Sequence, residues 1–205
     1  VPPNSRLRPR RHAGQRAKER VAELQIINSI QQGLAAELNF QAIVDLVGDK
    51  LREVLGAADI GISWYDPQAD LMHYLYMYEH GKRIFSDPMK PTSLVWHTLV
   101  ETRQPVIMNT PGESQAMGLK TIEGTDPSLS MAAIPIIGSN RVIGAISLEN
   151  YERENAFSEA NIRLLQTVAS SMGVALENAR LFDETQRLLK ETDQRASELA
   201  IINSV

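Results

Sequence analysis

The chain has no cysteine among its 205 residues. This absence excludes a disulfide-stapled fold, a thiolate metal centre, a cysteine nucleophile and any cofactor attached through a thioether bond. Long apolar segments are also absent, because the longest run, Met131–Ile137, falls far short of the ~20 residues that span a bilayer. We therefore expect a cytoplasmic protein without a membrane segment. Its 43% hydrophobic residues are nevertheless enough to bury a core.

Positive charge is scarce outside the amino-terminal stretch. The net charge is −4, yet residues 1–20 hold seven Arg or Lys and a single Glu, so the remainder is strongly acidic. An acidic body argues against nucleic acid as a partner. The basic stretch also contains Pro2, Pro3 and Pro9 and has no apolar periodicity. We interpret residues 1–19 as a flexible basic arm or linker.

Catalytic motifs are missing as well. The chain has no G-x-G-x-x-G, no P-loop, no H-E-x-x-H and no G-x-S-x-G. His73, His80 and His97 are too scattered to form a recognisable metal set. Because no nucleophile and base stand in a recognisable arrangement, we expect a protein that is not an enzyme.

The elements that are present alternate in type along the chain. Apolar residues at helical spacing start near Gln15 and continue to Leu34, and a second helix is predicted over Phe40–Leu55. Asn39 is a suitable N-cap for this second helix, and Gly56 a suitable residue after its end. Five strands are predicted after it: Ala58–Tyr65, Leu71–Tyr78, Pro105–Asn109, Met131–Ile137 and Arg141–Asn150. A short helix, Leu94–Thr102, is predicted between the second and the third of these strands. This order indicates an α+β fold in which helices are segregated to one face of an antiparallel sheet.

A long helix is predicted from Ser158 or Asn161 to about Asn203. Its apolar residues recur with heptad spacing, and beyond them Gln186 and Asp193 interrupt the row. Such a seam is typical of helices that associate, so we expect a homodimer with coiled-coil character. The dimer and signalling residues predicted in this way are Leu165, Val168, Met172, Ala175, Ala179 and Phe182.

The two ends of the chain echo each other. Residues 20–30 read Arg-Val-Ala-Glu-Leu-Gln-Ile-Ile-Asn-Ser-Ile, and residues 195–205 read Arg-Ala-Ser-Glu-Leu-Ala-Ile-Ile-Asn-Ser-Val. Seven of these eleven positions are identical. Similarity at such a separation is the mark of tandem domains. We therefore expect residues 188–205 to be a helical linker that runs into the start of a second, truncated repeat.

The carboxyl-terminal half of the chain resembles a known family. Residues 141–150 (Arg-Val-Ile-Gly-Ala-Ile-Ser-Leu-Glu-Asn), then Phe157-Ser-Glu, then residues 164–169 and 175–181, are similar to the carboxyl half of a GAF domain. The resemblance implies a PAS-like antiparallel sheet of about six strands over residues 20–187, with helices from both ends on one face and a small-molecule pocket on the other. It also implies a regulatory domain of a multi-domain bacterial signalling protein, covalently linked to further GAF-like domains and to an output domain.

Sub-families of GAF domains differ in the cofactor or effector that they bind. Cyclic-nucleotide-binding members carry Asn-Lys…Phe-x-x-x-Asp-Glu, whereas here Tyr151 replaces the Lys and Asn161-Ile162 replaces the Asp-Glu. This departure argues against a cyclic nucleotide. The lack of cysteine excludes a covalently bound bilin. Haem requires an axial histidine, for which His97 or His80 is a weak candidate.

Two functions from different classes remain open. The first is a sensor that binds a small molecule and relays the signal through dimeric helices to an output domain. The second is a structural dimerisation or spacer module with no ligand. For the sensor we expect a pocket on the sheet face away from the terminal helices, under the loops Glu79–Pro91 and Thr110–Ser128. Its candidate ligand-binding residues are small ones on the strands and larger ones around them: Tyr76, Trp96, Met108, Ser130, Ala132, Ala145 and Ser147.

Overall fold

The structure, a computed structural model, describes residues 21, 24–56, 58–119, 121 and 126–202. The predicted basic arm, residues 1–19, therefore lies outside the described residues, and the echoed segments at the two ends are described only in part.

The centre of the molecule is an antiparallel sheet of six strands in the order β3-β2-β1-β6-β5-β4. The strands are β1 (Asp59–Asp66), β2 (Leu71–Glu79), β3 (Lys82–Arg83), β4 (Val106–Met108), β5 (Ser130–Gly138) and β6 (Arg141–Asn150). Strand β1 pairs with its neighbour in sequence, β2, and also with the distant β6. The predicted α+β class and the six-stranded antiparallel sheet are confirmed.

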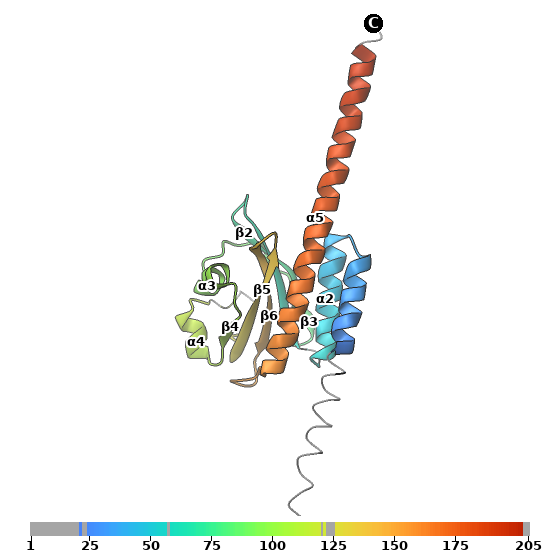
Figure 1. Cartoon of the computed structure of the whole chain (residues 1–205). Helices are drawn as coiled ribbons and strands as arrows, with labels where there is room; N and C mark the ends of the chain where they lie inside the picture. Colours follow the sequence, from blue (N-terminus) through green and yellow to red (C-terminus); the bar gives the residue numbers. More distant parts are fainter. Residues whose placement is uncertain (1–20, 22–23, 57, 120, 122–125, 203–205) are drawn as a thin grey trace, which may run out of the picture.

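Helices cover both faces of this sheet, but unequally. The first helix (residues 24–36), α2 (Phe40–Val54) and α5 (Glu159–Ile202) lie on one face, whereas the short α3 (Leu94–Thr102) and α4 (Pro111–Ala116) lie on the other (Figure 1). Asn39 caps α2 as predicted, since its side chain accepts a hydrogen bond from the Ala42 N–H at 2.9 Å. Helix α4 was predicted as loop, although Thr110 caps it and a proline occupies its first turn.

The main core lies between the sheet and the three larger helices. Ile43, Val47 and Leu51 of α2 are fully buried there, together with Ile134 of β5 and Ile146 of β6. Burial of this apolar surface is the dominant stabilising contribution. The two terminal helical regions are thereby fixed to the same sheet face, as the GAF resemblance implied.

Five of the six residues predicted for a dimer seam belong to this core. They are buried within one chain, where α5 contacts β5 and α2, and so expose almost nothing to a partner: Leu165, Val168, Met172, Ala175 and Ala179. Only Phe182 is substantially exposed, at 43%. The heptad spacing was therefore assigned to a partner surface although these residues pack on the chain's own sheet, because a helix that packs on a sheet shows nearly the same spacing.

Helix α5 continues well beyond the sheet. It has 44 residues, and the side chains from Leu181 to Lys190 are all exposed. Figure 1 shows this half projecting away from the rest of the domain. None of the described helices is long and apolar enough to cross a membrane.

Helix α5 and the β5–β6 hairpin approach each other closely. Ser139 (φ 46°) and Asn140 (φ 61°) form the turn with two left-handed residues, as in a type I′ hairpin. Near this turn Gly173 of α5 lies against the main chain of Ile137, so that a Cβ atom at position 173 would collide with the Ile137 carbonyl oxygen. A glycine is required there by the close approach of helix and strand.

Candidate functional site

A cavity of about 520 Å³ lies on the sheet face opposite α2 and α5. Its floor is formed by β1, β2, β5 and β6, and its other sides by α3 and by residues from the 84–93 and 111–128 segments. The volume falls in the range of small-molecule binding sites, roughly 300–1,000 Å³. The cavity therefore has the size and concave shape that a small organic ligand needs.

Small side chains on adjacent strands leave the space at the floor. Gly61 of β1 is opposite Ser147 of β6, and Ser63 is opposite Ala145. Ala133 of β5 pairs with Ser147 from the other side. All five residues line the cavity. Because successive residues of a strand alternate between faces, bulky neighbours such as Ile60 and Ile62 belong to the helix-side core.

The sides of the cavity are mainly apolar. Four methionines, Met72, Met77, Met89 and Met131, line it together with Trp96 of α3. Trp96 is held against Tyr65, with the ring centroids 5.1 Å apart. Thioether side chains are flexible and polarizable, so this wall can adapt to ligands of different shape.

One end of the cavity is polar and acidic. Glu79 is buried and accepts a hydrogen bond from the Asp126 N–H at 2.6 Å. The Tyr151 hydroxyl donates to Glu149 at 3.0 Å. His80 lies between these groups, with its Nε2 atom 3.1 Å from Asp126 Oδ2 and its ring 4.9 Å from that of Tyr151.

The ionisation of Glu149 is perturbed by this environment. Burial, opposed in part by the Tyr151 hydrogen bond, raises the pKa of Glu149, and the negative charges of Glu79 and Asp59 raise it further. Burial and Glu149 together also raise the pKa of Tyr74 and of Tyr151. Such perturbed groups in a concave site are a general mark of functional sites.

A divalent ion has one set of candidate ligands in the described part of the chain. The ligand atoms of Glu79, His80 and Asp126 all lie within 4.8 Å of one another. Two of these residues face solvent, since the side chains of His80 and Asp126 are 52% and 70% exposed. His97, which the sequence offered as a haem ligand, lines a separate hollow of about 470 Å³ with Arg103 and Arg141.

The candidate residues of the sequence fall into two groups. Trp96, Ala145 and Ser147 line the cavity. Tyr76 and Ala132 lie instead in the core on the helix-covered face. Two others also stay away from the cavity: Ser130 donates its hydroxyl hydrogen to the Arg153 carbonyl at 2.9 Å, and Met108 is buried beneath α3.

Strand register explains the misplaced candidates. Tyr74, Tyr76 and Tyr78 have the spacing of one strand face, but the β1–β2 pairing shifts between Ile62 and Ser63. This β-bulge leaves Tyr76 in the core and places Tyr74 on the cavity side. Likewise, Ala133 and not Ala132 pairs with Ser147, so the cavity face of β5 is the odd-numbered one.

Sequence reasoning missed the acidic end of the cavity. Glu79 was placed at the start of a loop and Glu149 was not among the candidate site residues, whereas both line the cavity. The available signal was the alternation along β6, in which Glu149 continues the row of Ala145 and Ser147.

Comparisons with known proteins agree with this geometry. The family model for the GAF domain matches residues 37–177. No curated protein matches the chain in sequence. Similar solved structures include the GAF domain of a phosphoenolpyruvate-protein phosphotransferase from Acinetobacter, with a TM-score of 0.67, 13% identity, and coverage of 78% of this chain and 95% of that one.

Two further similar structures come from proteins whose described functions differ from that of the phosphotransferase. Free methionine-R-sulfoxide reductase from Neisseria meningitidis, in complex with its substrate, has a TM-score of 0.64 and 16% identity over 78% of this chain and 90% of that one. The GAF domain of a protein described as a sensor histidine kinase, from Pseudomonas syringae pv. tomato, has a TM-score of 0.58 and 17% identity over 85% and 98%. At these identities the likeness establishes the fold.

Proposed function

Because the chain belongs to the GAF domain family, we propose that it is a regulatory sensor domain that binds a small molecule in its cavity and relays the event through α5. The observation that carries this proposal is the position of the cavity of about 520 Å³. Strands β5 and β6 form part of its floor, and α5 packs on the same strands from the other face. A ligand that shifts these strands therefore acts on the helix directly.

Similar proteins support a sensory role. One structural neighbour is a domain of a protein described as a sensor histidine kinase, and another is a methyl-accepting chemotaxis protein. We propose, in line with the echoed ends of the sequence, that residues 20–187 form the sensor unit and residues 188–205 a helical linker into a second GAF-like repeat of a cytoplasmic, multi-domain protein. Its partners are then the small effector and a covalently linked output domain.

The close approach at Gly173 provides the first step of the relay. The backbone of Ile137 touches this glycine on α5, and Ile137 lies at the bulge that follows Ile136 in the β5–β6 pairing. A rigid main-chain contact transmits displacement, because neither side has a flexible side chain to absorb it. Movement of the hairpin is thus passed to the middle of α5.

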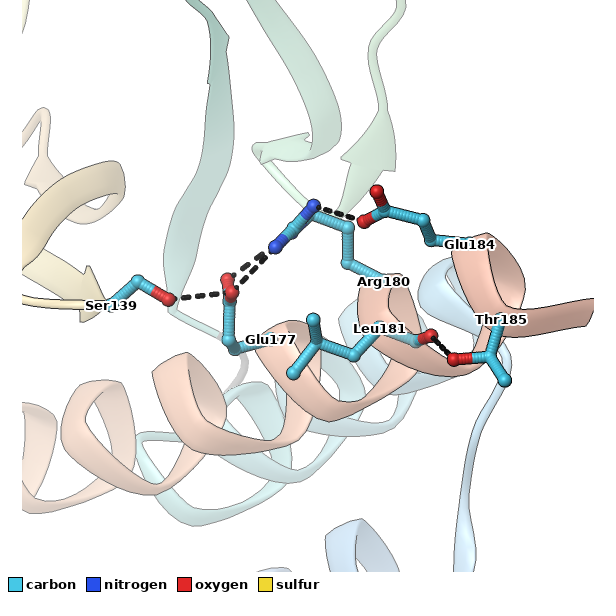
Figure 2. A network of polar contacts seen from close by, with 6 residues as sticks. All are labelled: Ser139, Glu177, Arg180, Leu181, Glu184 and Thr185. Atoms are coloured by element: carbon cyan, nitrogen blue, oxygen red, sulfur yellow. Dashed lines mark hydrogen bonds and ion pairs between the residues drawn. The ribbon is translucent and has the colours of Figure 1, made fainter. Parts of the chain in front are cut away.

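A polar network provides the second step (Figure 2). Ser139 at the hairpin turn donates a hydrogen bond to Glu177 of α5 at 2.5 Å. Arg180 pairs with Glu177 at 2.8 Å and with Glu184 at 3.0 Å. The Arg180 hydrogen bond, followed by that from Ser139, lowers the pKa of Glu177 and keeps it ionised. The network therefore connects the hairpin to the point where α5 leaves the domain.

We also propose that α5 forms a homodimer, through residues other than the seam read from the sequence. Val174, Leu181 and Leu188 are spaced by seven residues and are 61%, 47% and 49% exposed. Side chains at this spacing form one stripe along a helix, and exposed apolar stripes of this kind mark partner surfaces. Phe182, the one exposed member of the predicted seam, lies beside this stripe.

We propose that the domain has no catalytic activity of its own. The reductase among its neighbours acts on a sulfoxide. Reduction of a sulfoxide consumes two electrons, and this chain has no cysteine thiol to supply them.

A cavity-filling variant tests the sensor proposal. A thermal-shift screen of small metabolites on the purified chain should find a compound that raises the melting temperature. Ser147→Leu should abolish that shift by filling the floor, whereas Ser147→Ala, which keeps the space, should retain it. If no compound is found, or if Ser147→Leu still responds fully, the spacer function is favoured. Native mass spectrometry of the purified chain checks for a ligand that is already bound.

A further inference from the structure

The charges that line the cavity are strongly unbalanced. Among the described lining residues three are carboxylates, Glu79, Asp126 and Glu149, and one is a cation, Lys90. A fourth carboxylate, Asp59, pairs with Glu149 across β1 and β6. These like charges repel one another, and their repulsion contributes to the raised pKa of Glu149.

Of these carboxylates Glu79 is buried and Glu149 is partly buried, both at the end of the floor. Glu79 is 7% exposed. Burial is also the main cause of the perturbed ionisation of Glu149. Buried carboxylates in proteins are normally paired with a cation, because burying an isolated charge is costly. In the described part of the chain, however, no Arg or Lys lies within ion-pair distance of either residue.

Hydrogen bonds keep both carboxylates in place but do not neutralise them. The Asp126 N–H fixes Glu79, and the Tyr151 hydroxyl fixes Glu149. Among the described residues, the basic side chain recorded beside Glu79 is that of His80, whose Nε2 atom lies 3.9 Å from Glu79 Oε1 and which is half exposed. The acidic end is thus a pre-positioned acceptor site facing the cavity.

We propose that the effector of this domain is an organic cation, whose ammonium or guanidinium group lies between Glu79 and Glu149 and whose apolar body fills the methionine-lined remainder. This inference rests on the proposed function of the cavity. The bound cation supplies the counter-charge that no described Arg or Lys provides for the two carboxylates, and a donor nitrogen forms charge-assisted hydrogen bonds to them. Met72, Met89 and Met131 together with Trp96 then contact the apolar part of the ligand.

A bare divalent ion fits the site less well. Two of its three candidate ligands, His80 and Asp126, are exposed to solvent, and only Glu79 is buried. An ion held there would leave Glu149 without a partner and the apolar volume unfilled. The size of the cavity and its apolar walls therefore favour an organic cation over a metal.

Matched small probes test this inference on the full chain. Phenethylamine, 2-phenylethanol and 3-phenylpropanoic acid share an apolar body and differ in the charge of the head group. We expect calorimetry to show binding of the amine and at least about tenfold weaker binding of the alcohol and the acid, because one buried charge pair separates them. Glu149→Gln and Glu79→Gln should each weaken amine binding by about tenfold or more.

The control variant is Glu53→Gln, which removes an exposed carboxylate of α2 and should leave amine binding unchanged. Equal binding of the three probes, preference for the acid or the alcohol, or no amine binding at millimolar concentration would overturn the cation inference. A response to Zn²⁺ or Mn²⁺ alone that is lost in His80→Ala would also overturn it, in favour of a metal site. If a neutral or anionic metabolite binds the wild type and fails with Ser147→Leu, the sensor function stands and only the cation inference falls.

Discussion

The contact between Gly173 and Ile137 makes a quantitative prediction. In an unobstructed helix, replacing glycine by alanine stabilises by about 1 kcal/mol. At Gly173 the added Cβ meets the main-chain carbonyl of Ile137 in β5, and main chain that is paired in a hairpin cannot rotate away as a side chain would. Overpacking of this kind costs about 1–3 kcal/mol. Because the added Cβ overlaps main-chain atoms of Ile137, the cost lies near the upper end of this range, and the helical gain offsets part of it, so Gly173→Ala should lower the free energy of unfolding by about 2 kcal/mol.

Urea denaturation of the wild type and the variant, followed by circular dichroism, measures this difference. Gly112→Ala in α4 is the matched control, since the nearest atom to its added Cβ is Thr110 Oγ1 at 4.0 Å. The control should be as stable as the wild type or slightly more stable. A Gly173→Ala variant that equals or exceeds the wild type in stability would refute the reasoning, because it would mean that α5 and β5 separate at no cost. The relay proposed at this contact would then lose its mechanical basis.

Three other variants test further parts of the structure. Tyr76→Phe removes a part-buried hydrogen bond of 2.7 Å to α2 and should lower the free energy of unfolding by about 1 kcal/mol in urea titrations. Because burial raises the pKa of Glu149, the folded state binds this proton more tightly than the unfolded state does, and the free energy of unfolding falls as the pH rises through that pKa. Glu149→Gln should therefore raise the free energy of unfolding at pH 7 and leave it unchanged well below about pH 4. Leu181→Glu should convert the dimer to a monomer in sedimentation and leave the circular dichroism spectrum of the sheet unchanged; a monomeric wild type at tens of micromolar would contradict the dimer.

The parts of the fold that the sequence predicted well are those specified by local chemistry. Asn39 caps α2 through its own side chain, as expected, and the predicted strand Arg141–Asn150 has the same bounds as β6. Each of these signals depends on a few neighbouring residues and is independent of the tertiary structure. The element order, and with it the sheet and the helix-covered face, followed from such signals and from the family resemblance.

The candidate site was predicted less well because it depends on register. Every position of β5 from Met131 to Ile137 is apolar, so the sequence does not say which alternate residues face the cavity. Pairing of Ala133 with Ser147 decides it, and that pairing joins residues on two strands. The β-bulge that moves Tyr74 away from Tyr76 is likewise a property of the β1–β2 pair. Both errors are one-residue shifts, and a one-residue shift reverses the face of every side chain on a strand.

The error on α5 has a different origin. Its amino-terminal half has apolar residues on two sides, with Leu165, Val168 and Met172 against its own sheet and Val174 facing solvent. Both sets recur at nearly the same spacing, so periodicity alone does not identify which one meets a partner. The structure separates them because the sheet covers only one side and ends near Ala179, beyond which the side chains of α5 up to Lys190 are exposed in the described part of the chain. Apolar residues that persist past that point, as Leu188 does, gain nothing from the fold of one chain, and it is there that a second helix can bury them.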